Sequence, residues 1–307
     1  MLVAGIAVLI IILIASAGGS SGITPKDLAK KAALAKAKAK PKAAVVVDPL
    51  ITPGVHDWIA RRKGDVSAAV LNLKTGKEWL LNPDARDQTA SIIKADILET
   101  LLYQNTKSGE SVANAEGSVP EGMIEASDND DATALWDQIG GSTGITAYNV
   151  LAGLTQTTPN TQGFWGETTT SAADQIKILE QLSGPSKLLT KADQAYQLSL
   201  MTDIDPGEGW GVSGGVPKGV TVALKNGWVP LTSNSDWEVN SIGWIHGDDH
   251  DYLLAVLTAH DPSEGYGINT IRRIAASVYR TFGTEGVKPA TASSKTTTSK
   301  TKTTRSS

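Results

Sequence analysis

Strand-forming segments lie near both ends of this chain with a long helical stretch between them, and this order constrains the fold most. Residues 66–73 and 78–81 are rich in β-forming residues and are joined by a short turn, which predicts a hairpin. Further strands are expected at 220–225, 239–245 and 252–257. We therefore predict one antiparallel sheet built from both ends, packed against a helical layer from the middle.

The helices are predicted from the spacing of apolar residues. Between Ser91 and Tyr103, isoleucine, leucine and alanine recur with the helical period. The same reasoning predicts the other helices, at 52–62, 132–139, 145–154, 170–182, 191–202 and 269–282.

The two ends of the chain differ from its body in composition. Residues 1–22 carry no charge and are interpreted as a signal peptide, with a small-residue cleavage site at Ala15-Ser16-Ala17, or as a membrane anchor. Residues 23–49 form an Ala/Lys-rich linker, and residues 286–307 form a Thr/Ser/Lys tail that is expected to be disordered. The folded body is expected at 50–285.

Charge and cysteine content exclude several classes of protein. The chain contains no cysteine, which excludes disulfides, thiolate metal sites and cysteine nucleophiles. Its formal charge of −4 argues against a general nucleic-acid binder. The linker and the tail are basic, so the body between them is acidic; the basic ends either contact an anionic envelope surface or are simply solvated.

Ser91-Ile92-Ile93-Lys94 places a serine and a lysine three residues apart at the start of a predicted helix. That spacing puts the hydroxyl and the amine on one face. A serine needs an adjacent base to become a nucleophile, and a lysine is such a base when burial or a nearby cation lowers its pKa. The same pattern recurs at Ser299–Lys302 in the tail, so alone it is more typical of a surface helix.

Two other short motifs each have a structural alternative. Ser127-Asp128-Asn129 precedes a predicted helix, so it is either a helix N-cap or part of a catalytic site. Lys225-Asn226-Gly227 follows a predicted strand, so it is either a hairpin turn or a segment that approaches a ligand closely. Lys74-Thr75-Gly76 lies between two strands and is interpreted only as a turn.

Taken in the order Ser91, Ser127, Lys225, the three motifs resemble those of the penicillin-recognising serine enzymes, the class A β-lactamases and DD-peptidases. The segments at 127–154, 167–170 and 211–217 are also similar to that family, and the resemblance covers about residues 52–283. It implies an α/β (α+β) serine β-lactamase/DD-peptidase fold. In this fold an antiparallel sheet is flanked by helices, with a shortened helical subdomain beside it.

The resemblance implies a catalytic role for three residues. Ser91 is the nucleophile, Lys94 is the general base, and Ser127 relays a proton to the leaving nitrogen. The backbone N–H groups of Ser91 and Trp228 form the oxyanion hole.

The resemblance also implies substrate-binding roles. Asn129 holds the substrate amide and steadies Lys94. Lys225 attracts the substrate carboxylate and lowers the pKa of Lys94, and Gly227 lets the strand approach the substrate. Asn226 stands where the family usually has threonine or serine, and its amide is expected to donate to the carboxylate with a different geometry.

Departures from the family pattern affect the expected chemistry. The segments between Ser91 and Ser127 and around the omega loop are short. Class A enzymes carry a water-activating glutamate in that loop, whereas Phe164-Trp165-Gly166 has no carboxylate there. Glu167 matches the acidic residue that closes the loop and not the base. The resemblance thus supports acylation more firmly than rapid hydrolysis.

Histidine and tryptophan residues were weighed as other site candidates. His246 and His250 lie between two predicted strands and are interpreted as a solvated hairpin tip, so no metal site is expected. Four tryptophans near the motifs either line a cleft or pack in the core: Trp165, Trp210, Trp228 and Trp237.

The predicted function is that of an exported or membrane-tethered serine hydrolase. It forms an acyl-enzyme on Ser91 with β-lactams or peptidoglycan-like peptide amides, and it needs no metal or organic cofactor. The alternatives are a DD-peptidase, amidase or esterase, and a catalytically silent binding module of the cell envelope. The expected partners are a small-molecule or peptide substrate and the cell wall, with no nucleic acid, and the chain is expected to be a monomer. An uncleaved N-terminal segment would add the membrane.

Overall fold

The computed structural model describes residues 47–110, 118–231 and 236–285. From Val47 onward the chain forms one compact unit. The interpretations of residues 1–22 and 286–307, and of nearly all of the linker, concern residues outside the described part. Within the described part, no helix has both the length and the apolarity needed to cross a membrane.

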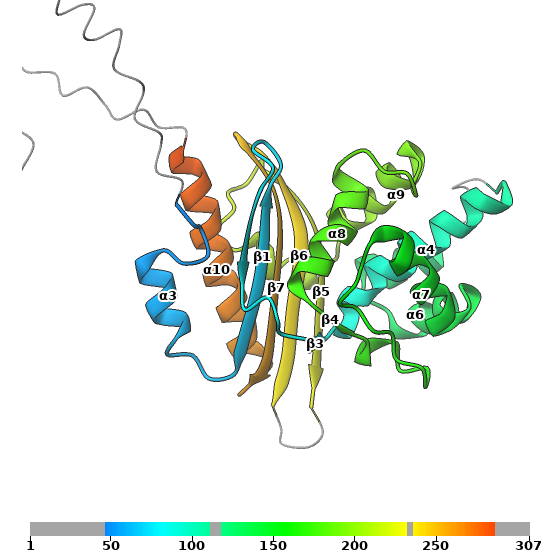
Figure 1. The fold of residues 1–307 in the computed structure, drawn as a ribbon, viewed down its shortest axis with the longest axis horizontal. Coiled ribbons are helices and arrows are strands. Elements are labelled where there is room, and N and C mark those ends of the chain that lie inside the picture. Colours follow the sequence, from blue (N-terminus) through cyan, green and yellow to red (C-terminus); the bar gives the residue numbers. More distant parts are fainter. Residues whose placement is uncertain (1–46, 111–117, 232–235, 286–307) are drawn as a thin grey trace, which may run out of the picture. The chain divides into compact units, whose positions relative to one another are not determined.

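The central element is a five-stranded antiparallel sheet with the strand order β2-β1-β7-β6-β5 (Figure 1). The predicted meeting of the two ends of the body is confirmed, because β1 pairs with β7 from Asp65↔Ala259 to Asn72↔Tyr252. The strands are β1 (Asp65–Asn72), β2 (Lys77–Leu81), β5 (Thr221–Pro230), β6 (Trp237–Gly247) and β7 (His250–Asp261).

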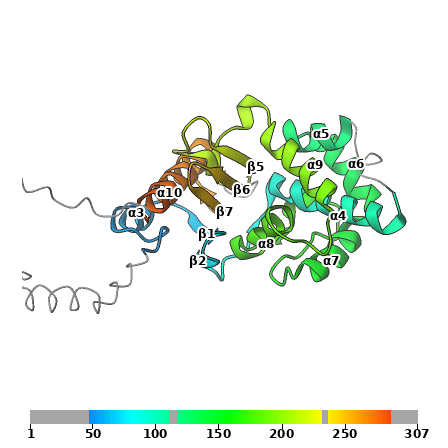
Figure 2. The ribbon, with the colours of Figure 1, turned by 90° about the horizontal axis from the view of Figure 1, so that it is seen from above.

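Helices cover both faces of the sheet. Figure 2 shows α3 (Pro53–Ile59) and α10 (Glu264–Glu285) on one side and α8 (Ala172–Ser183) on the other. Alternate residues of β7 therefore enter two apolar cores, with Leu254 and Val256 facing α10 and Leu253 and Leu257 facing the other helices. This double burial explains why the sequence of β7 is apolar almost throughout.

The remaining helices form the predicted helical layer around α4 (Ile93–Ser108). Its other members are α5 (Ser118–Glu125), α6 (Asn129–Gln138), α7 (Gly141–Ala152) and α9 (Lys191–Thr202). The first turns of α4 are buried on all sides, so this helix carries polar groups such as Lys94, Asp96 and Glu99 into the interior.

Several local elements differ from the sequence predictions. The third strand does not end near Lys225 but continues to Pro230, because β6 pairs with it along its whole length. Four short helical turns were not predicted: η1 (Ala90–Ile92), η3 (Trp165–Glu167), η4 (Pro206–Glu208) and η5 (Gly211–Ser213). Helix α5 was not predicted either, nor was the pairing of β3 (Asp87–Gln88) with β4 (Thr169–Thr170).

Two buried carboxyl groups lie between α4 and α7. Burial raises the pKa of Asp96 from 3.8 to about 8, although hydrogen bonding by Asn149 acts in the opposite direction. The Asn149 amide nitrogen, in the orientation that satisfies both groups, donates to the Asp96 oxygens at 3.1 and 3.0 Å. Burial also raises the pKa of Glu99, which accepts a 2.7 Å hydrogen bond from the Tyr148 hydroxyl.

Asp96→Asn is expected to weaken the dependence of stability on pH. Because the folded-state pKa of Asp96 is raised, its contribution to stability is complete below about pH 4 and is lost as the pH rises toward 8. The slope of unfolding free energy against pH should therefore be less negative in the variant, by up to ~1.4 kcal/mol per pH unit. Urea unfolding across this pH range measures it. The exposed Asp137→Asn on α6 is the control, and an unchanged slope in Asp96→Asn would contradict the expectation.

Candidate active site

The structure brings the three sequence motifs together where the helical layer meets strand β5. Ser91 lies on η1, and Lys94 lies in the first turn of the adjoining α4. Ser127 lies in the loop before α6, whose first residue is Asn129, and Lys225 lies on β5. The described chain thus places groups from distant sequence segments around one serine.

The Ser91 turn depends on close contact with β5. An added Cβ on Gly227 would lie 2.6 Å from the Ser91 nitrogen and 2.8 Å from the Thr89 oxygen. Only a glycine allows this approach, because the obstructing atoms belong to the backbone. Ala90, just before the serine, has a φ of 46°, a strained value for a residue that is not glycine.

Asn240 on β6 fixes the segment that leads into this turn. Its side-chain nitrogen donates to the Gln88 and Thr89 carbonyl oxygens at 2.8 and 3.1 Å. Its side-chain oxygen accepts from the Thr258 backbone N–H at 3.2 Å. Sequence reasoning missed Asn240, and its only signal was an amide side chain inside an apolar strand.

Lys94 is fully buried, and its amine makes three hydrogen bonds. It donates to the Ser127 carbonyl oxygen at 2.6 Å, the Asn129 Oδ1 at 2.9 Å and the Ser127 Oγ at 3.2 Å. Burial, followed by the positive charge of Lys225, lowers the pKa of Lys94 from 10.5 to about 7. A neutral amine is therefore available near neutral pH, one helical turn from Ser91.

Ser127 links the two lysines. Its Oγ accepts from Lys225 Nζ at 2.8 Å as well as from Lys94, and its backbone has a φ of 57°. Its neighbour Asp128 is the N-cap of α6 and accepts from the Asp131 N–H at 2.9 Å. Both interpretations of this motif therefore hold, because Asp128 caps the helix while Ser127 and Asn129 face Lys94.

Lys225 lies in the middle of β5, so the hairpin-turn alternative for its motif is wrong. Its side chain is 1% exposed, and burial lowers its pKa to about 8, against the opposing effect of the Glu208 carboxylate. Asn226 and Gly227 pair with Ser241 and Asn240 of β6. Pairing between strands thus overrides the turn preference of Asn-Gly.

Asn226 requires a correction of its expected role. Its amide nitrogen donates to the carbonyl oxygens of Glu208 at 2.6 Å and Trp210 at 3.1 Å, and the residue is 1% exposed. Both N–H donors are therefore used on the side of η4 and η5, away from the pocket. The structure does not present this amide to a substrate carboxylate.

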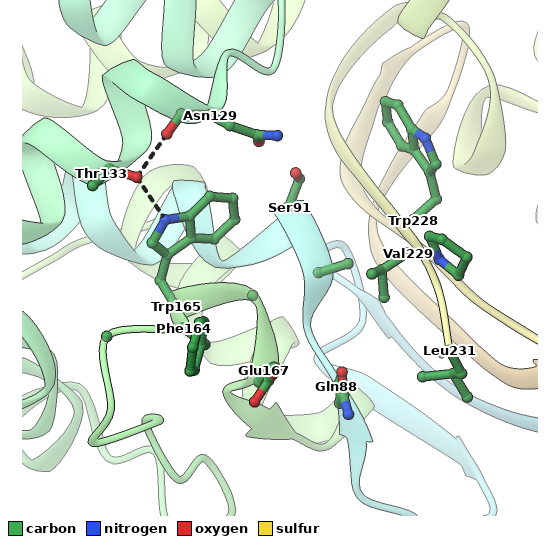
Figure 3. Close-up of a pocket in the computed structure, with 14 residues that line it drawn as sticks. Gln88, Ser91, Asn129, Thr133, Phe164, Trp165, Glu167, Trp228, Val229 and Leu231 are labelled. Atoms are coloured by element: carbon green, nitrogen blue, oxygen red, sulfur yellow. Dashed lines mark hydrogen bonds between the residues drawn. The ribbon is translucent and has the colours of Figure 1, made fainter. Parts of the chain in front are cut away.

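A pocket of about 490 Å³ opens at Ser91 (Figure 3). Figure 3 shows the Ser91 hydroxyl directed into it, with Asn129 on one side and Trp228 on the other. Lys94, Ser127 and Lys225 do not line this pocket and lie behind its wall.

Trp165 is the main aromatic group on the pocket wall. Its ring centroid lies 4.9 Å from Lys94 Nζ, and its Nε1 donates to the Thr133 Oγ1 at 3.2 Å. Trp165 and Trp228 line the pocket, whereas Trp210 and Trp237 pack into the core against α10. Glu167 also lines the pocket and accepts from Asn160 Nδ2 at 3.1 Å.

The two histidines of the β6–β7 hairpin lie at its turn, as predicted. Asp248 and Asp249 form the turn itself, with φ values of 50° and 61°. His246 is exposed, but His250 is buried and stacks on Tyr279 at 3.8 Å, so the solvated interpretation is wrong for His250. Across the described ranges, no group of three or more potential metal-ligating side chains is found.

Gly227→Ala is expected to destabilise the fold by ~1–3 kcal/mol, because the new methyl group meets immobile backbone atoms of the Ser91 turn. Urea unfolding measures the change. Gly265→Ala is the matched control, since a Cβ there meets open space in helix α10 and should leave stability unchanged or slightly raised. Equal stabilities of Gly227→Ala and the wild type would show that this contact is not tight.

Comparisons with known proteins agree with this geometry. A model of the β-lactamase enzyme family matches residues 117–282. A protein named "Putative lipoprotein LppW" from Mycobacterium bovis is 25% identical over 228 residues, which is 73% of this chain and 72% of that protein. The LppW protein of Mycobacterium tuberculosis matches to the same extent.

Solved structures match over most of the chain. The TLA-1 extended-spectrum β-lactamase superposes with a TM-score of 0.67 at 16% identity, covering 75% of this chain and 97% of that one. PBP-A superposes with a TM-score of 0.65 at 20% identity, covering 75% and 94%. The predicted fold, a sheet flanked by helices as in class A β-lactamases, is therefore confirmed. Because the family model spans more than half of the sequence, the chain belongs to the β-lactamase enzyme family.

Proposed function

We propose that this protein is a serine hydrolase that forms an acyl-enzyme on Ser91. One observation carries the proposal: a buried lysine with a lowered pKa lies one helical turn from a serine that opens into a pocket. A purely structural lysine gains nothing from a second buried lysine beside it, whereas a general base does.

The proposed acylation uses the groups that surround Ser127. The neutral amine of Lys94 takes the proton of the Ser91 hydroxyl while the Ser91 oxygen bonds to the substrate carbonyl carbon. When the bond to the leaving nitrogen or oxygen breaks, the Ser127 hydroxyl gives that atom its proton. Ser127 then regains a proton from the Lys94 ammonium, with which it is already hydrogen-bonded.

Deacylation is proposed to be slow. Hydrolysis of the acyl-enzyme needs a water molecule and a base that activates it. The segment that would supply this base presents Trp165 to Lys94, and Glu167 is engaged by Asn160. The acyl-enzyme is therefore expected to persist longer than in an efficient β-lactamase.

The candidate substrates are β-lactams and peptidoglycan-like peptide amides. The family membership supports this class, and a DD-peptidase, amidase or esterase is the alternative within the same chemistry. The name of the LppW relatives, together with the apolar start of the sequence, supports an exported protein of the cell envelope. A silent envelope-binding module remains the alternative from another class.

Intact mass spectrometry of the full-length protein with benzylpenicillin tests the proposal, with Ser91→Ala as the control. A lasting mass increase on the wild type alone would support acylation with slow deacylation. Consumption of penicillin without an adduct would mean rapid turnover and overturn the slow step. If penicillin and a serine-directed fluorophosphonate both leave the wild type unmodified, the silent module is favoured.

The rate of Ser91 acylation is expected to rise with pH around a midpoint near 7, because only the neutral Lys94 amine accepts the serine proton. Lys225→Met removes a positive charge that lowers the pKa of Lys94, so the midpoint should move to higher pH. The charges of Asp128 and Glu208, which raise this pKa, remain in the variant. Fluorophosphonate labelling across the pH range measures both midpoints, and a midpoint that stays put or falls would contradict the assignment.

A further inference from the structure

We propose that the pocket at Ser91 selects uncharged esters or amides that carry an apolar or aromatic group, and disfavours substrates with a carboxylate. This inference rests on the proposed acyl-enzyme chemistry and names its substrate class. It departs from the expectation, drawn from the sequence resemblance, that Lys225 and Asn226 attract a substrate carboxylate.

The charges that line the pocket are the first support. Among its described lining residues, Glu167 is the only one with an ionisable side chain, and neither lysine nor arginine is present. The internal segments outside the described part, 111–117 and 232–235, also contain no lysine or arginine. A carboxylate in this pocket would thus meet a negative charge without a compensating cation.

The two nearby lysines do not supply that cation. Lys94 and Lys225 are 0% and 1% exposed, and both donate to Ser127. Lys225 also donates to the Asn226 carbonyl oxygen at 3.2 Å, and the negative charge of Glu208 acts on it. Moving either amine to a substrate carboxylate would break hydrogen bonds inside the catalytic group.

Asn226 gives the second support. Its two N–H donors hold the carbonyl oxygens of Glu208 and Trp210, so they are directed away from the pocket. Its neighbour Gly211 is packed too closely for this amide to swing freely, because even a Cβ on Gly211 would lie 2.8 Å from Asn226 Oδ1. The side chain at this motif position therefore reads no anionic group.

The walls of the pocket give the third support. Figure 3 shows Phe164 and Trp165 on one side of Ser91, and Trp228, Val229 and Leu231 on the opposite side. Phe164 is 58% exposed, which makes it one of few large apolar side chains left uncovered in the described chain. Two facing apolar walls favour a ligand that buries hydrocarbon or an aromatic ring between them.

A matched pair of esters tests the selection. p-Nitrophenyl pentanoate and the p-nitrophenyl monoester of glutaric acid have acyl chains of equal length, and only the second carries a carboxylate. Acylation is followed by release of nitrophenol from the full-length protein, with Ser91→Ala as the background. We expect the neutral ester to react roughly tenfold faster or more, since like charges at close range repel.

Variants of the wall separate charge from shape. Val229→Arg adds a cation to the pocket and should raise the rate of the carboxylated ester relative to the neutral one, whereas Val229→Gln should not. Glu167→Gln should shift the same ratio in the same direction, and Asp137→Asn, outside the pocket, should leave it unchanged. Because each readout is a ratio of two substrates in one protein, partial loss of folded protein does not alter it.

The outcomes distinguish this inference from the function beneath it. If the carboxylated ester reacts as fast as or faster than the neutral ester, the inference is overturned while acylation of Ser91 stands. If neither ester acylates Ser91, the proposed function fails and the inference with it. A preference for the neutral ester that Val229→Arg reverses would support both.

Discussion

The site depends on one costly arrangement, the burial of two lysine amines against a single serine oxygen. Lys94 and Lys225 come from different layers of the fold, and both donate to the Ser127 Oγ. Two positive charges removed from water at such short range repel each other, so burial and mutual repulsion favour a neutral amine. The helical layer and the sheet must therefore hold each other in register, and the Gly227 contact with the Ser91 turn provides that register.

Much of the fold could be predicted from the sequence, because alternating and helical apolar patterns survive in the final elements. Helix 191–202 and the hairpin of β1 and β2 are examples. The length of β5 could not be predicted, since the pairing of Lys225–Gly227 with β6 is a long-range effect that contradicts a strong local turn signal. Local sequence describes preferences, and the sheet decides between them.

The candidate site divides in the same way. Ser91, Lys94, Ser127, Asn129 and Lys225 meet in the structure, because motif spacing and family resemblance both report on backbone position. The direction of the Asn226 amide, the support from Asn240 and the stacking of Trp165 on Lys94 depend on side-chain packing across the interior. A resemblance at 16–20% identity carries the fold to such a pocket, but the polarity of its walls is set by this chain's own residues.

The pairing of β1 with β7 has a consequence for the birth of the protein. β1 emerges early in synthesis, and its central partner, β7, is almost the last strand to be made. The sheet, and with it the contact between β5 and the Ser91 turn, is thus completed only when nearly the entire body is available. Proteins dominated by such distant pairings fold slowly. A ribosome-bound fragment that ends before β7 would hold its nucleophile without the strand order that presses glycine against it.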